Sequence, residues 1–280
     1  MNQIDKNELF GHVQKLPAMS AVVTELLATI DQDEIDVDSI ARKICCDQVI
    51  AVKTLRLANS SFYGMQHKIS NMSEAINILG FKNVRMLVAT SAITASFSPA
   101  KHGYFNYSSF WQHSTGTAIC AKEIASSVGA NQEVAFIAGL IHDIGKLVLV
   151  THYPKHYAGA VEFQIQNGCE LKTAERKTMG MDHGEISAVV IGHWNFPEKI
   201  QMAISTQHLD DDDPKYQLSG IIHLANAFAY GLDFSNDKSA VVPAISKQVW
   251  SRLNLDEPCC HRIFREALRK FEDLSHSLVT

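Results

Sequence analysis

Residues 139–150 read GLIHDIGKLVLV, a short apolar stretch that places His142 directly before Asp143. Small residues recur at i−7, i−4 and i−3 from His142, which predicts a helix with a stripe of small side chains. Such a stripe leaves room near His142 for another helix, or for a metal ion with its ligands. Lys146 follows about one helical turn later, near enough to neutralise Asp143 or to reach a phosphate.

The apolar periodicity around this stretch is helical along almost the whole chain. Apolar residues between Met19 and Ile30 recur at i, i+3, i+4, i+7, i+8 and i+11, which predicts a helix beginning after Pro17. Residues 37–44 repeat the pattern over a shorter span. We find no alternating stretch of strand length between hairpin turns. The sequence therefore predicts an all-α fold.

Three polar or turn-forming segments interrupt the helical pattern, at residues 98–106, 210–214 and 231–238. The first contains Pro99 and Gly103 and is the best boundary between two helical halves. We accordingly expect an N-terminal helical subdomain at residues 1–104, a second helical subdomain at residues 105–234 and a C-terminal helical extension at residues 235–280.

The composition excludes several classes of protein. The 280 residues are 46% hydrophobic, which argues against disorder, and the net charge of −5 argues against a nucleic-acid partner. The charged N-terminus resembles no secretion signal, and no apolar run approaches a membrane span, so we expect no membrane partner. The six cysteines lack C-x-x-C spacing. We therefore expect reduced thiols and a cytoplasmic protein.

The adjacent His142 and Asp143 supply an imidazole nitrogen and a carboxylate oxygen, a mixture that suits Fe, Mn, Zn or Ni better than Ca or Mg. Further ligands must come from other helices, and His113, His183 and His208 are candidates because they lie on otherwise apolar stripes. The alternative for each is an ordinary hydrogen-bonded core or capping histidine. There is no Walker A, H-E-x-x-H or G-x-S-x-G motif.

The order of His113 and then His142-Asp143 within GLIHDIGK resembles the HD superfamily of metal-dependent phosphohydrolases. The N-terminal half is similar to the HDOD domain, the HD-related output domain of bacterial signalling proteins. The similar segments are LPAM (16–19), KTLRLANSSFYG (53–64) and AINILGFKNVRML (75–87), followed by FWQHS (110–114), DHGEISAVVIGHWNFPEKI (182–200) and HLANAFAYG (223–231). Together they cover roughly residues 16–232.

The resemblance implies an N-terminal helical bundle packed on a divergent HD-type helical bundle. HDOD domains are regarded as regulatory or scaffolding outputs, so a stand-alone unit would receive its signal from a separate signalling protein. Phe62 and Tyr63 are candidates for the partner surface, with a place in the core as the alternative.

In an active HD enzyme, the first-helix His, the HD pair and a late Asp hold the metal. His113, His142 and Asp143 match the first three, Lys146 matches the lysine of the longer HD motif, and Asn226 stands where the enzymes carry Asp. The resemblance also places His183 and His208 near the extra ligand positions of two-metal HD-GYP phosphodiesterases, although the G-Y-P element itself is missing.

Two hypotheses follow from these residues. The first is a stand-alone regulatory module that acts through protein–protein interaction and retains a degenerate metal site. The alternative is a metal-dependent phosphohydrolase or phosphodiesterase. In that case His113, His142, Asp143, His183 and His208 would hold a divalent transition metal, with Asp143 and Lys146 as the catalytic residues.

Overall fold

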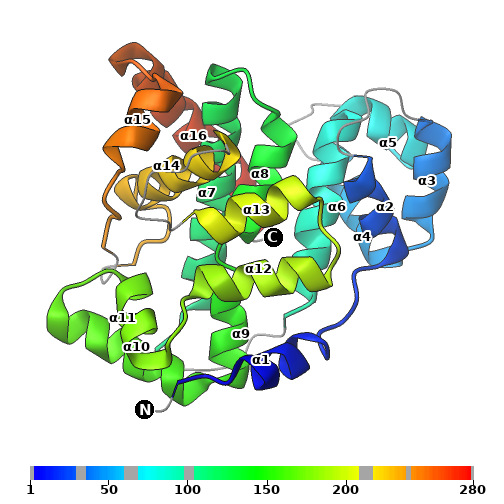
Figure 1. The fold of residues 1–280 in the computed structure, drawn as a ribbon. Helices are drawn as coiled ribbons and strands as arrows, with labels where there is room; N and C mark the ends of the chain where they lie inside the picture. Colours follow the sequence, from blue (N-terminus) through cyan, green and yellow to red (C-terminus); the bar gives the residue numbers. More distant parts are fainter. Residues whose placement is uncertain are drawn as a thin grey trace. The chain divides into compact units, whose positions relative to one another are not determined.

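The computed structural model describes residues 3–29, 36–59, 69–97, 104–207, 217–237 and 241–278. None of these residues lies in a strand, and α-helices follow one another along the chain (Figure 1), which confirms the all-α prediction. By its internal contacts the chain divides into two compact units. The larger consists of residues 1–17 and 97–271, and the smaller of residues 18–96 and 272–280.

The smaller unit is a set of short helices packed through apolar faces. They are α2 (Ala21–Ala28), α3 (Val37–Cys45), α4 (Gln48–Ala58), α5 (Met72–Leu79) and α6 (Phe81–Ala95). Helix α6 packs against α2, α4 and α5, and α3 packs against α4 and α5. The α5–α6 corner turns at Gly80, whose φ of 78° lies in the region that side chains disfavour.

The larger unit contains the remaining helices. They are α1 (Lys6–Val13), α7 (Tyr107–Ser127), α8 (Gln132–Ile141), α9 (Gly145–His152), α10 (Pro154–Asn167), α11 (Leu171–Met179), α12 (His183–His193), α13 (Glu198–Thr206), α14 (Gln217–Gly231), α15 (Lys247–Leu253) and most of α16 (Glu257–Leu278). Helix α7 packs against α8 and α14, and α12 packs against α9 and α13. These contacts bring together segments that lie far apart in the sequence.

The first residues of the chain belong to this larger unit. The backbone N–H of Ile4 donates to the carbonyl of Met179 at 3.0 Å, and Leu9 and Val13 of α1 are buried. The indole N–H of Trp194 donates to the carbonyl of Pro17 at 3.1 Å. By these contacts, residues 1–17, 97–104 and 235–271 all fall in the larger unit with residues 105–234.

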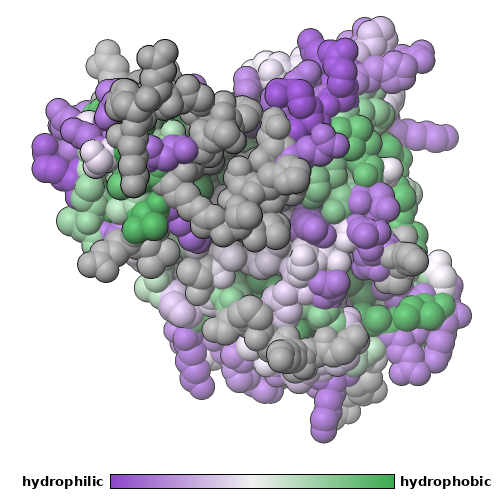
Figure 2. Space-filling model, turned by 180° about the vertical axis from the view of Figure 1, so that it is seen from behind, coloured by the Kyte–Doolittle hydropathy of each residue, from purple (hydrophilic) through white to green (hydrophobic). Residues whose placement is uncertain are grey.

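The segment Gln132–His152 is long and apolar enough to cross a membrane by length and composition, but 94% of it is buried within the protein. This burial is what a core segment shows, because a buried segment has no polar face to present to water. Outside the grey atoms of Figure 2, hydrophobic and hydrophilic residues are interspersed on the face drawn there.

Candidate metal centre and its pocket

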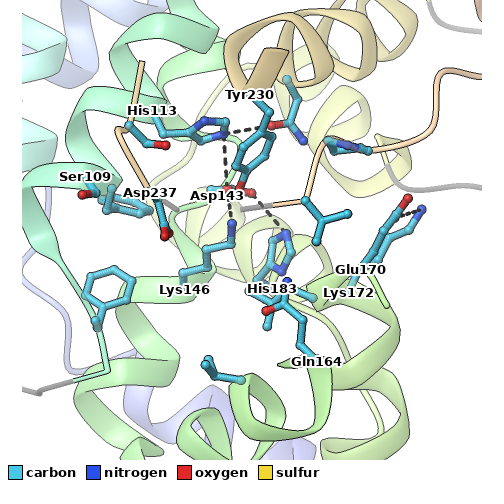
Figure 3. Close-up of a pocket in the computed structure, with 18 of the residues that line it drawn as sticks. Ser109, His113, Asp143, Lys146, Gln164, Glu170, Lys172, His183, Tyr230 and Asp237 are labelled. Carbon is cyan, nitrogen blue, oxygen red and sulfur yellow. Dashed lines mark hydrogen bonds and ion pairs between the residues drawn. The ribbon is translucent and has the colours of Figure 1, made fainter. Parts of the chain in front are cut away.

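Helices from distant parts of the sequence converge on Asp143 in the larger unit (Figure 3). Helix α7, the turn between α8 and α9, the first turn of α9, the first residue of α12, and α14 each contribute a polar side chain. These are His113, His142 with Asp143, Lys146, His183 and Asn226, all of which are buried. Every predicted site residue except His208, which lies outside the described residues, is therefore in this part of the fold.

The HD pair itself does not lie within a helix, contrary to the sequence-based expectation. Helix α8 ends at Ile141, and residues 142–144 form a turn before α9 begins at Gly145. The turn brings the chain against α12, where the N–H of Gly145 donates to Ser187 Oγ at 2.8 Å. A Cβ on Gly145 would lie 2.1 Å from the carbonyl oxygen of His183. Only glycine permits this approach, which places His183 beside Asp143.

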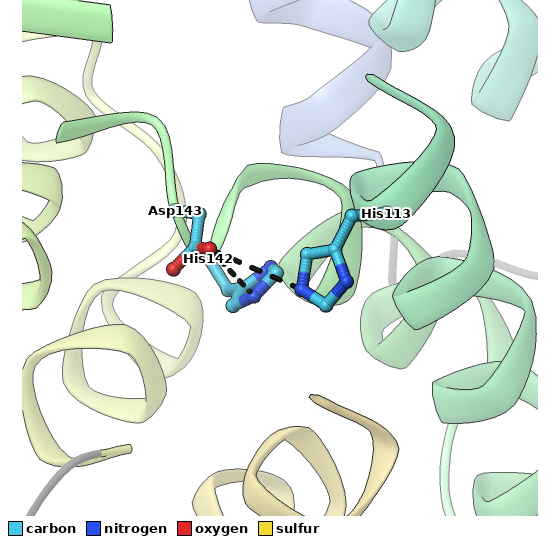
Figure 4. Close-up of side chains that lie close together, drawn as sticks. All are labelled: His113, His142 and Asp143. Carbon is cyan, nitrogen blue, oxygen red and sulfur yellow. Dashed lines mark ion pairs between the residues drawn. The ribbon is translucent and has the colours of Figure 1, made fainter. Parts of the chain in front are cut away.

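His113, His142 and Asp143 form a group that could hold a metal ion, because each offers a ligand atom within 4.8 Å of the others (Figure 4). His142 Nε2 lies 3.4 Å from Asp143 Oδ2, and His113 Nε2 lies 4.0 Å from the same oxygen. Two imidazoles and one carboxylate are a donor set that suits divalent transition metals.

His142 is held in the tautomer that a metal ligand needs. Its Nδ1 lies 2.7 Å from the carbonyl oxygen of Gly139 and donates to it, which leaves the lone pair on Nε2. Within the described part of the chain, Nε2 has no hydrogen-bond partner. Burial lowers the pKa of His142, so the ring is neutral and its lone pair is available.

His113 is held differently, because its Nε2 lies 2.9 Å from Oδ1 of Asn226. The ring also lies against Tyr230, with 4.0 Å between the ring centroids. Burial lowers the pKa of His113 to about 3, so the imidazole is neutral. The N–H of His113 Nε2 donates to Asn226 Oδ1, which orients the ring, but the amide of Asn226 brings no negative charge to the site.

Asp143 is already neutralised by a lysine. Lys146 Nζ lies 2.5 Å from Asp143 Oδ2, and both groups are buried. Burial would raise the pKa of Asp143, but the charged Lys146 and His183 hold it well below the usual range. Burial likewise opposes the charge on Lys146, yet Asp143 raises the lysine pKa well above its usual value. The pair is therefore fully ionised.

The second oxygen of Asp143 faces a charged histidine. His183 Nε2 lies 3.1 Å from Asp143 Oδ1, and its Nδ1 lies 2.5 Å from Glu175 Oε2. Although burial opposes protonation, Glu175 and Asp143 raise the pKa of His183 to about 9. His183 therefore carries a proton on each nitrogen at neutral pH and offers no lone pair there.

Glu175 is a site residue that the sequence did not suggest. It is 0% exposed on α11, and its Oε2 also accepts the backbone N–H of His183 at 2.9 Å. Its neighbours Arg176 and Lys177 make the segment read as a solvated helix face. In the sequence, only the apolar residues Ala174 and Met179 indicate that this face of α11 is buried. Both are buried in the structure.

His113, Asp143, Lys146, His183 and Asn226 form the floor of a cavity of about 160 Å³, which we call the HD pocket. One wall is aromatic and includes Tyr104, Phe105, Phe110 and Tyr157, while polar groups from α10, α11 and α14 line the rest. Burial raises the pKa of Tyr157 and of Tyr230, so both phenols are neutral hydrogen-bonding groups. The pocket offers a polar floor and an aromatic wall to a small ligand.

The fold and the arrangement of His113, His142 and Asp143 define an HD-type all-α protein. The sequence matches the HDOD domain family over residues 16–209, and the chain belongs to this family.

Three crystal structures are similar to this chain over most of its length. A provisionally named phosphohydrolase from Shewanella amazonensis is 25% identical, covers 95% of this chain and 97% of its own, and has a TM-score of 0.71. An HDOD domain protein of unknown function from Geobacter sulfurreducens is 23% identical, with 98% and 96% covered and a TM-score of 0.69. A provisionally named signal transduction protein from Marinobacter aquaeolei is 21% identical, with 94% and 59% covered and a TM-score of 0.79.

Among curated sequences, an uncharacterized protein of Treponema pallidum is 22% identical over 201 residues. The alignment covers 70% of this chain and 38% of that protein, so the chain spans well under half of the relative's length.

Proposed function

We propose that this chain is a regulatory signal-transduction module that acts through a protein partner and does not use its HD pocket for metal-dependent hydrolysis. The observation that carries this proposal is the buried ion pair between Lys146 and Asp143, at 2.5 Å. The ammonium group lies on the carboxylate oxygen that also faces His113 and His142. A divalent metal would have to displace it.

The charge of the site supports the same conclusion. Asp143 is the single carboxylate in the donor group of His113, His142 and Asp143, and Lys146 and His183 already neutralise it. Asn226 has the shape of an aspartate, but an amide oxygen attracts a divalent cation less strongly than a carboxylate does. The fold keeps the histidines in place while the negative charge that would attract a metal is reduced.

The family and the similar structures support a role in signalling. HDOD domains are regarded as outputs of bacterial signalling proteins, and the Marinobacter structure bears the name of a signal transduction protein. In this reading the polar floor of the HD pocket stabilises the scaffold, and a surface of the molecule binds the partner. Phe62 and Tyr63, the aromatic candidates for that surface, lie outside the described residues.

A metal-dependent phosphohydrolase is the second candidate, and the unpartnered Nε2 of His142 favours it. His113, His142 and Asp143 would hold the metal, which would supply a water of lowered pKa as the nucleophile. Lys146 would release Asp143 and bind the phosphate instead. The Shewanella structure, which bears the name of a phosphohydrolase, supports this candidate.

Element analysis of the purified chain and a phosphodiesterase assay separate the two candidates. The substrate is bis(p-nitrophenyl) phosphate, with Mn²⁺ or Fe²⁺ added to the wild type and to His142→Ala. We expect substoichiometric metal and the same background turnover in both proteins. Stoichiometric metal with turnover that His142→Ala abolishes would establish the enzyme instead.

A gain-of-binding variant tests the geometry of the site directly. Asn226→Asp places a carboxylate 2.9 Å from His113 Nε2 if the side chain keeps its position, and we expect Mn²⁺ to bind at least about 10-fold more tightly. Isothermal titration calorimetry measures the affinity, and Asn226→Ser is the matched control that should show no gain. Equal Mn²⁺ affinity in Asn226→Asp and the wild type would show that α14 does not contribute to a metal site.

The partner is tested with the full chain as bait in a native lysate. The regulatory reading expects a specific partner that binds the wild type and His142→Ala equally well, because the pocket histidines lie within the scaffold. A partner that depends on His142 would assign the HD pocket itself to the interaction.

A further inference from the structure

A non-helical segment, residues 241–246, borders the HD pocket between the described part of the α14–α15 connection and α15. Val241 and Pro243 line the pocket together with His223, Glu170 and Lys172. Figure 3 labels Glu170 and Lys172. We call residues 241–246 the strap. Its position means that a change in the strap changes access to the polar floor.

Two side chains from different helices hold the backbone of the strap. The N–H of Ala244 donates to Glu170 Oε1 at 3.2 Å, and the N–H of Ser246 donates to His223 Nε2 at 3.1 Å. Glu170 is the residue directly before α11 and makes no capping hydrogen bond with its side chain, and His223 lies within α14. The backbone of the strap is thus hydrogen-bonded to Glu170 and to His223, which lie on different elements lining the pocket.

The strap gains little from apolar burial. None of its six residues is buried, and the side chains of Val242 and Ile245 are 54% and 40% exposed. A segment with exposed side chains and few backbone hydrogen bonds opens at a low free energy compared with a packed helix. The two hydrogen bonds to Glu170 and His223 therefore account for much of what holds the strap in place.

We propose that the strap narrows the mouth of the HD pocket and is released when the imidazole of His223 is protonated. The release follows from the hydrogen bonds of the ring. Nδ1 donates to the carbonyl of Gln207 at 3.3 Å, so Nε2 carries the lone pair that accepts from Ser246. Protonation places a hydrogen on Nε2, which can then no longer accept this bond.

The groups around His223 determine the direction of the effect. Burial lowers the pKa of His223, Lys172 lowers it further, and Glu170 together with the carbonyls of Gln207 and Ala244 raises it, with a net shift downward. A neutral ring is thus favoured while the strap is closed. In an open strap the ring is more solvated and returns toward the ordinary histidine pKa of about 6.5. The strap therefore closes above that pH and opens as the pH falls below it.

Amide hydrogen exchange at Ser246 and Ala244 tests this proposal in the full chain, without any metal, ligand or partner. We expect the protection factor of Ser246 to fall by up to about 10-fold between pH 7.5 and pH 5.5, the ratio given by a histidine of pKa about 6.5 in the open state. Amides within α7 serve as the internal control. A protection factor of Ser246 that does not change with pH would overturn the proposal.

Two variants of His223 give a matched comparison. In His223→Gln the amide oxygen can accept from Ser246 without titrating, so we expect protection that is independent of pH. His223→Leu removes the acceptor and should lower the protection at both pH values. If the leucine variant does not fold, the wild type and the glutamine variant still decide, since equal pH dependence in both would exclude His223.

The rate of chemical modification of His113 measures access to the pocket. His113 lines the pocket and remains neutral across this pH range, so it stays reactive toward diethyl pyrocarbonate. We expect peptide mass spectrometry to show faster modification of His113 at pH 5.5 than at pH 7.5, the opposite of an exposed histidine. Slower modification at pH 5.5 would show that the strap does not control the mouth. A regulatory function for the opening of the strap rests on the proposed regulatory role of the chain, but the modification rate of His113 can be measured whether or not the chain has that role.

Discussion

The two oxygens of Asp143 face histidines that the fold holds in opposite ways. On the side of Oδ2, His142 donates to a backbone carbonyl and His113 meets an amide oxygen, so both rings are neutral. On the side of Oδ1, His183 lies against the carboxylate of Glu175 and is charged. We call these the neutral side and the charged side of Asp143.

The difference shows that the second partner of an imidazole decides what the imidazole can do. A neutral acceptor on Nδ1 fixes a tautomer and leaves a lone pair for a metal, as at His142. A carboxylate on Nδ1 stabilises the imidazolium, which then acts as a cation toward Asp143. One aspartate thus belongs both to a group that could bind a metal and to a network that already supplies the positive charge.

The largest expected effect comes from removing the charge that the two sides share. Asp143→Asn leaves the cation of Lys146 buried without its carboxylate and leaves His183 with Glu175 alone. We expect the free energy of unfolding to fall by about 3–5 kcal/mol, the range for breaking a buried ion pair. Urea denaturation measures it.

A double variant supplies the control for Asp143→Asn. Adding Lys146→Met removes the uncompensated cation and should restore part of the lost stability. If the loss of stability in the double variant equals the sum of the losses in the two single variants, the Lys146–Asp143 pair contributes nothing to stability. Asp143 would then not join the two sides as described.

The pH dependence of stability should distinguish the two sides. The pKa of His183 is raised to about 9, so its contribution is complete below the unfolded value of about 6.5 and is lost as the pH rises toward 9. The pKa of His113 is lowered to about 3, so its contribution is complete above about pH 6.5 and is lost as the pH falls. We expect these sites to give maximal stability near pH 6.5, with losses on the order of 2 kcal/mol on each side.

Urea denaturation in the presence of EDTA at several pH values measures both arms of this curve. His183→Gln should flatten the alkaline arm and leave the acid arm, whereas His113→Gln should leave the alkaline arm and reduce the acid arm without removing it, because burial also lowers the pKa of His142 and of His223. An alkaline arm that persists in His183→Gln would show that another group titrates there.

A smaller effect is expected at the hydroxyl group of Tyr230, whose ring packs against His113 on the neutral side of Asp143. The side chain of Tyr230 makes a hydrogen bond with Lys146. Tyr230→Phe keeps the ring against His113 but removes this acceptor, so we expect a loss of about 1 kcal/mol in the free energy of unfolding. In Lys146→Met the same substitution should have almost no effect, and an undiminished loss there would assign the hydroxyl to a different partner.

Much of the fold could be predicted from local patterns. The apolar stripe of residues 19–30 corresponds to α2, and Asp182 and Glu185, which have the spacing of a capping box, form one at the start of α12. Such features depend on spacing within a few residues, which a sequence contains in full. The family motifs likewise led to His113, Asp143, Lys146 and Asn226, which line one pocket, and to His142, which lies beside His113 and Asp143.

The remaining features depend on contacts between distant segments. Glu175 is buried because α11 turns this residue toward His183, which no local pattern indicates. Helix α8 ends before His142 because Gly145 approaches α12 closely. The sequence does not indicate this end, because its helical pattern of apolar residues continues through residues 142–144. Lys146 pairs with Asp143 because both are buried and lie close together. The spacing in the sequence left open whether Asp143 would bind a metal, or whether Lys146 would bind a phosphate, instead.

The close approach at Gly145 has a mechanical consequence. Because the backbone of Gly145 lies close against the carbonyl of His183 and is hydrogen-bonded to the hydroxyl of Ser187, movement of the loop bearing His142 and Asp143 along α12 would break this bond and disturb the close packing. Any force on that loop therefore passes directly to the helix that begins at His183, and both must shift together as one stiff element.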